Sequence, residues 1–211
     1  MKKVVKPIFK SHMVPNTLGK IISDQELKQL RIAETEKFAH VTYFFNGGDE
    51  NEFNGEDRVL VPSPRVKTYD LQPEMSAYEM TDIVIKKIQS QKYDFILINY
   101  ANTDMVGHSG QMEATIKAVE TLDKCTNKLL KVSEDENYTL IITSDHGNAD
   151  CMIDDELMPC TTHTTNPVPF IVCTKENIIL NNGSLADISP TVLDLMGIEK
   201  KKDMSGKSLI K

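Results

Sequence analysis

The sequence lacks the features that direct a protein to membranes or nucleic acids. None of its apolar runs approaches the ~18 residues that a transmembrane helix needs. The opening MKKVVKPIFK has neither the apolar core nor the cleavage site of a signal peptide. The formal net charge is -7, with acids and bases interspersed. We therefore expect a cytoplasmic globular protein without nucleic-acid or membrane partners, in which an anionic substrate would need a local source of positive charge.

The cysteines are also not arranged as a known motif. The four of them, Cys125, Cys151, Cys160 and Cys173, show no CxxC spacing. This excludes zinc-ribbon and thioredoxin-like sites and fits a reducing compartment. The chain has no internal repeat or low-complexity segment.

Apolar strand-like runs alternate with amphipathic stretches along the chain. Strands are predicted at residues 58–61, 94–100, 138–143 and 167–172, and helices at residues 77–90, 112–132 and 186–197. Residues 38–45 fit either a strand or a helix, and we favour the helix. Because each helix is flanked by strands, as parallel crossovers require, the pattern predicts an α/β fold with a mostly parallel sheet flanked by helices.

Carboxylates and histidines follow the predicted strands. Asp104 and His108 come after the strand that ends near residue 100, and Asp145 and His146 come after the strand that ends near residue 143. His163 precedes the last predicted strand. In open α/β sheets ligands bind at the carboxyl ends of the strands. Asp and His together suit zinc or manganese, so these segments predict a metal site that could hold a pair of ions.

A single Asp-x3-His is more often a capping carboxylate and a hydrogen-bonded histidine than a metal site. Three of the five histidines, however, lie in short segments at strand ends, and this combination favours metal binding. We interpret His12 and His40 as structural or exposed. Gly147, directly after Asp145-His146, is expected to let the backbone turn sharply.

The order Asp-x3-His, Asp-His and a later His resembles the metal-binding signature of the alkaline phosphatase superfamily. Longer segments are similar, nearly residue by residue, to the family of 2,3-bisphosphoglycerate-independent phosphoglycerate mutases. These segments are residues 31–42, 45–48, 61–65, 69–78, 99–110, 144–150, 163–169, 187–197 and 204–209. The resemblance covers the chain from about residue 14 onward.

Complete members of that family interconvert 3-phosphoglycerate and 2-phosphoglycerate through a phosphoserine intermediate, in glycolysis and gluconeogenesis. The resemblance implies two manganese ions or other divalent ions, no requirement for 2,3-bisphosphoglycerate, small-molecule substrates and a monomeric enzyme.

The likeness is confined to the carboxyl-terminal part of the phosphatase domain. Residues 17–211 would form that part, and residues 1–16 would be the connection from an inserted transferase domain or an artificial start. The family's Asn-Ser-Glu-Val-Gly-His segment with its serine nucleophile is absent, and so is an earlier Asp ligand. The arginines of the inserted domain are missing too, since the chain has only Arg31, Arg58 and Arg65. The chain alone is therefore expected to be inactive.

The resemblance also implies residue roles. Asp104, His108 and His163 resemble the ligands of one manganese ion, and Asp145 and His146 resemble two ligands of the second. Lys37 resembles the lysine that reaches the phosphate or the leaving oxygen. From local sequence alone Lys37 would instead be an exposed lysine near a helix start.

Two alternatives stay open. A related metal-dependent phosphohydrolase or phosphopentomutase would share Asp-x3-His and Asp-His, but should lack the Glu-Thr-Glu-Lys segment at 34–37 and the Leu-Gln-Pro-Glu-Met-Ser segment at 71–76. A non-catalytic binding module is the other alternative, because the chain contains no recognisable nucleophile.

Overall fold

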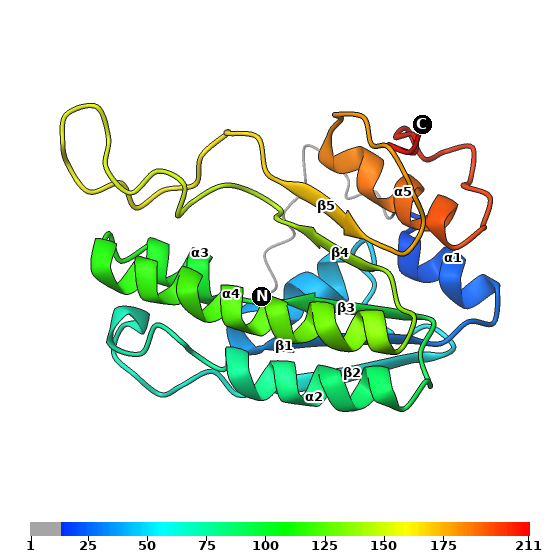
Figure 1. Ribbon diagram of the computed structural model, residues 1–211, viewed down its shortest axis with the longest axis horizontal. Helices are drawn as coiled ribbons and strands as arrows, with labels where there is room; N and C mark the ends of the chain where they lie inside the picture. The colour runs from blue at the N-terminus through cyan, green and yellow to red at the C-terminus, as the bar shows by residue number, and fades with distance from the viewer. Residues whose placement is uncertain (1–13) are drawn as a thin grey trace, which may run out of the picture.

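The strands form two separate sheets (Figure 1). The computed structural model describes residues 14–211, so almost all of the predicted connection at residues 1–16 lies outside the described residues, as does His12. The strands are β1 (Gln29–Glu34), β2 (Glu56–Val61), β3 (Phe95–Asn99), β4 (Leu140–Thr143) and β5 (Phe170–Cys173). The first sheet has the order β2-β1-β3 and is parallel throughout, whereas β4 and β5 form an antiparallel pair.

Helices lie between the strands and on either side of them in the sequence. They are α1 (Leu18–Asp24), α2 (Ala77–Gln89), α3 (Asn102–Gly107), α4 (Met112–Asp135) and α5 (Ile188–Leu195), with short turns of helix η1 (Thr35–Lys37), η2 (His40–Phe44), η3 (Tyr69–Leu71) and η4 (Leu185–Asp187). The three predicted helices are confirmed to within a few residues, and the helical choice for residues 38–45 is also confirmed. The last helix stops before Gly197, whose φ of 68° is left-handed and ends the helix.

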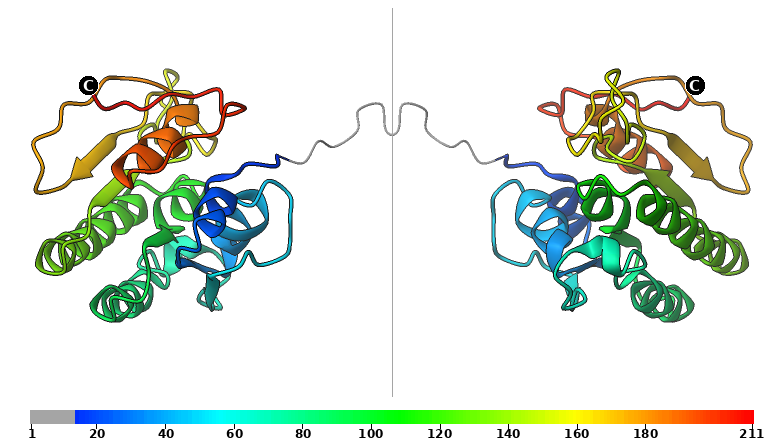
Figure 2. Two further views of the ribbon diagram at one scale, coloured as in Figure 1. Left: turned by 90° about the vertical axis from the view of Figure 1, so that its right-hand side faces the viewer. Right: turned by 90° about the vertical axis from the view of Figure 1, so that its left-hand side faces the viewer.

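The two faces of the parallel sheet are covered by different helices (Figure 2). α2 and α4 pack against one face, where Ile32, Met80 and Leu129 belong to one buried cluster. α1 and α5 pack together in a second cluster that includes Ile21 and Leu193. A parallel sheet with helices on both faces confirms the predicted α/β class.

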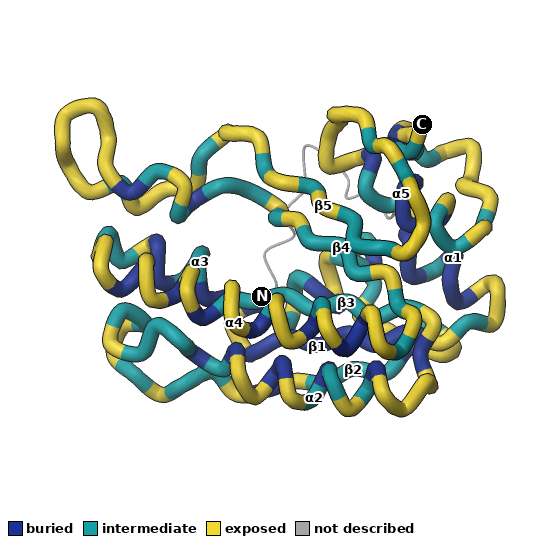
Figure 3. The backbone as a smooth tube through the Cα atoms, in the orientation of Figure 1, coloured by how far each residue is buried: buried dark blue, intermediate teal, exposed yellow. Residues whose placement is uncertain are grey.

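The crossover through α4 does not bring β4 next to β3. We expected the helices to connect parallel strands. α2 does this by crossing from β2 to β3 past the central strand β1, but among the described residues β4 pairs only with β5. A groove of about 760 Å³ lies between β3 and β4, lined by apolar side chains that include Ile96, Ile98 and Ile141. All five residues of β3 are only half-buried as a result (Figure 3).

The last strand also differs from its prediction. β5 begins at Phe170 rather than at residue 167. Pro167 and Pro169 lack the backbone N–H that a strand needs for pairing, so the ladder starts after them. No helix within residues 14–211 has both the length and the apolar character required to cross a membrane.

Candidate metal centre

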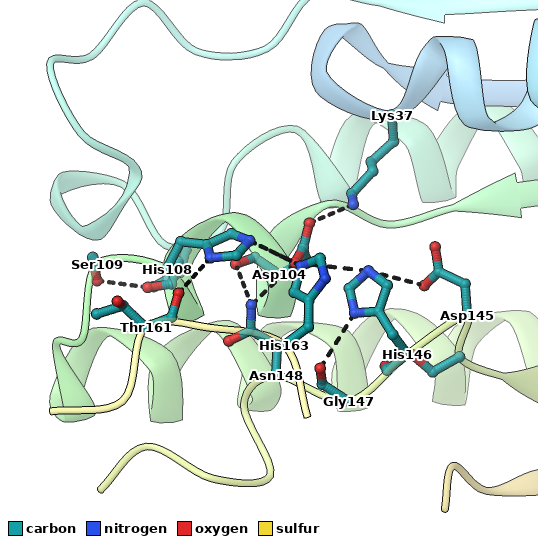
Figure 4. Close-up of polar contacts among 12 residues, drawn as sticks. Lys37, Asp104, His108, Ser109, Asp145, His146, Gly147, Asn148, Thr161 and His163 are labelled. Atoms are coloured by element: carbon teal, nitrogen blue, oxygen red, sulfur yellow. Dashed lines mark hydrogen bonds and ion pairs between the residues drawn. The ribbon is translucent and has the colours of Figure 1, made fainter. Parts of the chain in front are cut away.

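Three chain segments bring the predicted metal-ligating side chains together (Figure 4). The segment after β3 forms the helix α3, which places Asp104 four residues before His108 on one helical face. Asp145 and His146 follow β4 directly, and His163 lies on the segment that leads into β5. The carboxyl ends of β3 and β4 therefore supply the site, as the sequence predicts.

The side chains meet around one carboxylate oxygen. Asp104 Oδ1 lies 3.0 Å from His163 Nε2 and 3.1 Å from His108 Nε2, and the two Nε2 atoms lie 3.1 Å apart. His146 is slightly farther, with Nε2 at 3.9 Å from the same oxygen. Its ring stacks on that of His163 at a centroid distance of 3.7 Å. Asp145 Oδ1 lies 3.7 Å from His146 Nε2, at the edge of the group.

This arrangement fits a divalent ion. Ligand atoms of Asp104, His146 and His163 lie within 4.8 Å of one another, and His108 approaches from the opposite side. His108 Nδ1 lies 2.7 Å from the Thr161 carbonyl oxygen, and this short contact suits an Nδ1–H donor. The Nε2 lone pair then faces Asp104, as it does in histidines that bind metal with backbone support. One carboxylate and several imidazoles form a donor set for zinc or manganese.

Lys37 belongs to the same group and is not an exposed lysine. It stands at the end of η1, just after β1, and only 4% of its surface is accessible. Its Nζ donates to Asp104 Oδ2, so Asp104 uses one oxygen for Lys37 and the other toward the histidines. Burial alone would raise the pKa of Asp104, but the hydrogen bond and charge of Lys37, with Asn148 and His108, lower it to about 2. The carboxylate is therefore ionised and ready to act as a ligand.

Sequence reasoning missed Asn148. Its Nδ2 donates to Asp104 Oδ1 at 3.1 Å and lies 3.3 Å from the Asp104 carbonyl oxygen. This contact depends on Gly107, because a Cβ there would lie 2.4 Å from Asn148 Oδ1. Nothing in the local sequence around Asn148 indicates a partner 44 positions away.

The structure gives Gly147 a role that the sequence does not indicate. Gly147 does not have a left-handed φ. A Cβ at this position would instead lie 2.2 Å from Thr164 Oγ1 and 2.6 Å from Asp150 Oδ1. The glycine is needed because two chain segments approach closely at this point.

His40 lies near the site but is not part of the ligand group. It is half-buried, its Nδ1 has no hydrogen-bond partner, and its ring contacts Phe44 edge-on. Burial lowers its pKa, and the nearby charge of Lys37 lowers it further.

Beside the ligand group a cavity of about 210 Å³ is lined by Lys37, Asp104, Asp145 and His146, among others. A small anionic group could bind there next to the lysine.

Comparison with known proteins places the chain in a class. It belongs to the metalloenzyme superfamily, whose family model matches residues 8–200. The chain is 58% identical over 205 residues to the 2,3-bisphosphoglycerate-independent phosphoglycerate mutase of Ehrlichia ruminantium (strain Gardel), with 96% of this chain and 41% of the relative covered. It is 57% identical over 207 residues to the enzyme of the same name from Antithamnion sp., with the same coverage.

A solved structure gives the same result. The chain matches the Leishmania mexicana phosphoglycerate mutase, determined at low cobalt concentration, with a TM-score of 0.84 and 32% identity. The match covers 90% of this chain and 38% of that one. The resemblance seen in the sequence motifs is thereby confirmed, and the chain spans about two fifths of the length of the curated relatives it matches.

Proposed function

We propose that the chain is the carboxyl-terminal, metal-binding part of a cytoplasmic 2,3-bisphosphoglycerate-independent phosphoglycerate mutase. The complete protein would interconvert 3-phosphoglycerate and 2-phosphoglycerate in glycolysis and gluconeogenesis, act as a monomer, and need neither 2,3-bisphosphoglycerate nor a nucleic-acid or membrane partner. The observation that carries the proposal is the convergence of Asp104, His108 and His163 within 3.1 Å of one another, in a chain closely related to enzymes of that name.

In this proposal the residues divide between two ions. Asp104, His108 and His163 hold the first, and Asp145 and His146 contribute to the second. Manganese bound there would neutralise the charge of a phosphate group and activate the hydroxyl that accepts it. The contacts of His108 with the Thr161 carbonyl and of Asp104 with Asn148 fix the direction of the ligands.

Lys37 is the proposed phosphate-binding residue. Its ammonium group is buried beside the 210 Å³ cavity and held by Asp104. A buried cation next to a cavity attracts a phosphate more strongly than an exposed one, because less solvent screens the charge. This would be the local source of positive charge that an acidic chain needs for an anionic substrate.

We further propose that residues 17–211 are an incomplete domain. The groove between β3 and β4 supports this, because both strands leave an edge unpaired on the groove side within the described residues. Alternating residues of β4 reach different cores: Leu140 contacts the cluster under α2 and α4, and Ile141 contacts the cluster under α1 and α5. β4 thus lies in the position of a further strand of the first sheet, and a strand from another part of the protein would complete the sheet.

The test is an assay of the complete protein that contains this chain. With 3-phosphoglycerate as substrate, we expect manganese-dependent formation of 2-phosphoglycerate that a chelator abolishes and that needs no added 2,3-bisphosphoglycerate. Release of inorganic phosphate as the main product would instead indicate a phosphohydrolase. Turnover of ribose 1-phosphate would indicate a phosphopentomutase, and the absence of turnover on all substrates would indicate a binding module.

A further inference from the structure

Two passes of the chain run side by side above the metal centre and form a hairpin. The bridge Gly147↔Thr164, with the Thr164 N–H donating to the Gly147 carbonyl at 2.9 Å, joins them at the base. Farther along, the Cys160 N–H donates to the Met152 carbonyl at 2.9 Å. Near the tip the N–H of residue 154 donates to the carbonyl of residue 158, also at 2.9 Å. This hairpin projects from the body of the molecule as the yellow loop in Figure 1.

Each pass carries one cysteine, and the Cys160 N–H that donates to the Met152 carbonyl brings Cys160 beside the residue that follows Cys151. Cys151 and Cys160 are both free and both partly exposed. The two thiols are near enough for each to shift the pKa of the other. The other cysteines differ: Cys125 is buried in α4, and Cys173 lies in β5.

The two thiols are not equivalent. The Thr162 backbone N–H, and then its hydroxyl at 3.7 Å, lower the pKa of the Cys160 thiol. Partial burial and the neighbouring Cys160 raise the pKa of the Cys151 thiol, whose Sγ lies 3.5 Å from the Ile153 carbonyl oxygen. Cys160 is therefore the better nucleophile of the pair at neutral pH.

We propose that Cys151 and Cys160 form a reversible disulfide that ties together the two chain passes leading to the metal centre. A small-molecule disulfide such as oxidised glutathione is the oxidant. The Cys160 thiolate attacks one sulfur of glutathione disulfide, and a glutathione thiolate leaves and takes up the proton that Cys160 released. The Cys151 thiolate then attacks the Cys160 sulfur of the mixed disulfide and expels the second glutathione. Two cysteine thiols are oxidised, one disulfide is reduced to two thiols, and two protons are transferred.

A disulfide between Cys151 and Cys160 would act on the segments that carry the metal-ligating histidines. His146 precedes the first pass and His163 lies within the second, so the base of the hairpin connects two of the three histidines of the ligand group. A cross-link that closes a short loop restricts its open conformations. Oxidation would therefore slow the opening of this base and hold the segments of His146 and His163 in register. In a reducing compartment a partly exposed pair of cysteines of this kind serves as a redox sensor rather than as a permanent structural disulfide.

The bond can be tested on the 211-residue chain without any metal or substrate. The purified chain is equilibrated with defined ratios of reduced and oxidised glutathione, its free thiols are alkylated, and it is cleaved with a glutamate-specific protease. Cleavage after Glu156 separates the two cysteines. We expect a reductant-sensitive cross-link between the two fragments, and hydrogen exchange at the Cys160 and Thr164 amides slowed roughly tenfold or more.

Three variants complete the test. Cys160→Ser and Cys151→Ser should each abolish the cross-link, and the matched control Cys173→Ser should retain it. A wild-type chain that stays fully reduced at every glutathione ratio would overturn the proposal. A cross-link that survives in Cys160→Ser would also overturn it, because Cys173 would then be the partner. If oxidation leaves hydrogen exchange at the Cys160 and Thr164 amides unchanged, the disulfide does not hold the two passes together and that part of the proposal is refuted. None of these results depends on mutase activity.

Discussion

His108→Ala should weaken metal binding to the chain. His108 Nε2 lies 3.1 Å from Asp104 Oδ1 and from His163 Nε2, so it supplies one of three close ligand atoms. Structural zinc sites with four ligands bind with ~10–16 kcal/mol, so one ligand contributes about 3 kcal/mol, or roughly a hundredfold in affinity. His146 Nε2, at 3.9 Å from the same oxygen, could replace part of this contact and reduce the loss to about tenfold.

Manganese titration by calorimetry measures the effect directly. The matched control is His40→Asn, because His40 is near the site and half-buried but lies outside the ligand group. We expect the control to stay within about twofold of the wild-type affinity. Urea unfolding of both variants checks that the fold is retained, and the 39% exposure of the His108 side chain predicts that it is. Wild-type affinity in His108→Ala, or an equal loss in His40→Asn, would refute the assignment. In the complete protein, His108→Ala should abolish mutase activity.

Four further results are expected. Manganese binding should weaken as the pH falls through the range in which imidazoles protonate, and excess metal should restore it, because protons and manganese compete for the histidines. If the loss of binding at low pH does not depend on the metal concentration, this competition is ruled out. The chain alone should bind one manganese ion tightly and show no turnover of 3-phosphoglycerate, because Asp145 and His146 are too few ligands for a second ion; calorimetry and a coupled assay check both statements. Glu34→Gln should reduce the pH dependence of the free energy of unfolding. Burial raises the pKa of Glu34 in the folded protein above its value in the unfolded chain. The stabilisation from protonated Glu34 is therefore complete below the unfolded-state pKa and is lost as the pH rises through the folded-state pKa, by ~1.4 kcal/mol per unit of pKa difference. Urea unfolding across that range should show a flatter profile for the variant, and parallel profiles would rule the reasoning out. The apolar groove and the unpaired edges of β3 and β4 should make copies of the isolated chain associate. Leu97→Lys in this groove should lower that association in light scattering, and unchanged association would show that the groove is not the contact.

Much of the fold could be predicted because the local signals are strong. The apolar spacing along α2 and α4 defines each helix, and the residues at these positions pack on the sheet, as Met80 and Leu129 do. The separation of β4 from β3 could not be predicted, because a sequence pattern shows that a strand exists but not which neighbour it pairs with. The strand-like signal of residues 138–143 is satisfied on one side by β5 and on the other side faces the groove.

The site was predictable in its residue types and only partly in its contacts. Asp104 and His108 are neighbours on one helical turn, so their spacing in the sequence is enough to predict that their side chains lie close together. Lys37 and Asn148 reach Asp104 across 67 and 44 positions, and such contacts exist only once the sheet has formed. Family resemblance indicated Lys37, and no local signal indicated Asn148.

Asp104 also determines which substitutions the site can tolerate. Its two oxygens serve different partners, Lys37 on one side and the histidines with Asn148 on the other, and its backbone carbonyl contacts Asn148 as well. Asparagine would keep the shape but lose the charge that holds Lys37. Glutamate would keep the charge but carry the carboxylate one methylene farther from the helix, into the histidine rings. Neither conservative replacement can satisfy both sides at once, so this position should accept no residue but aspartate, even in a chain that tolerates change elsewhere.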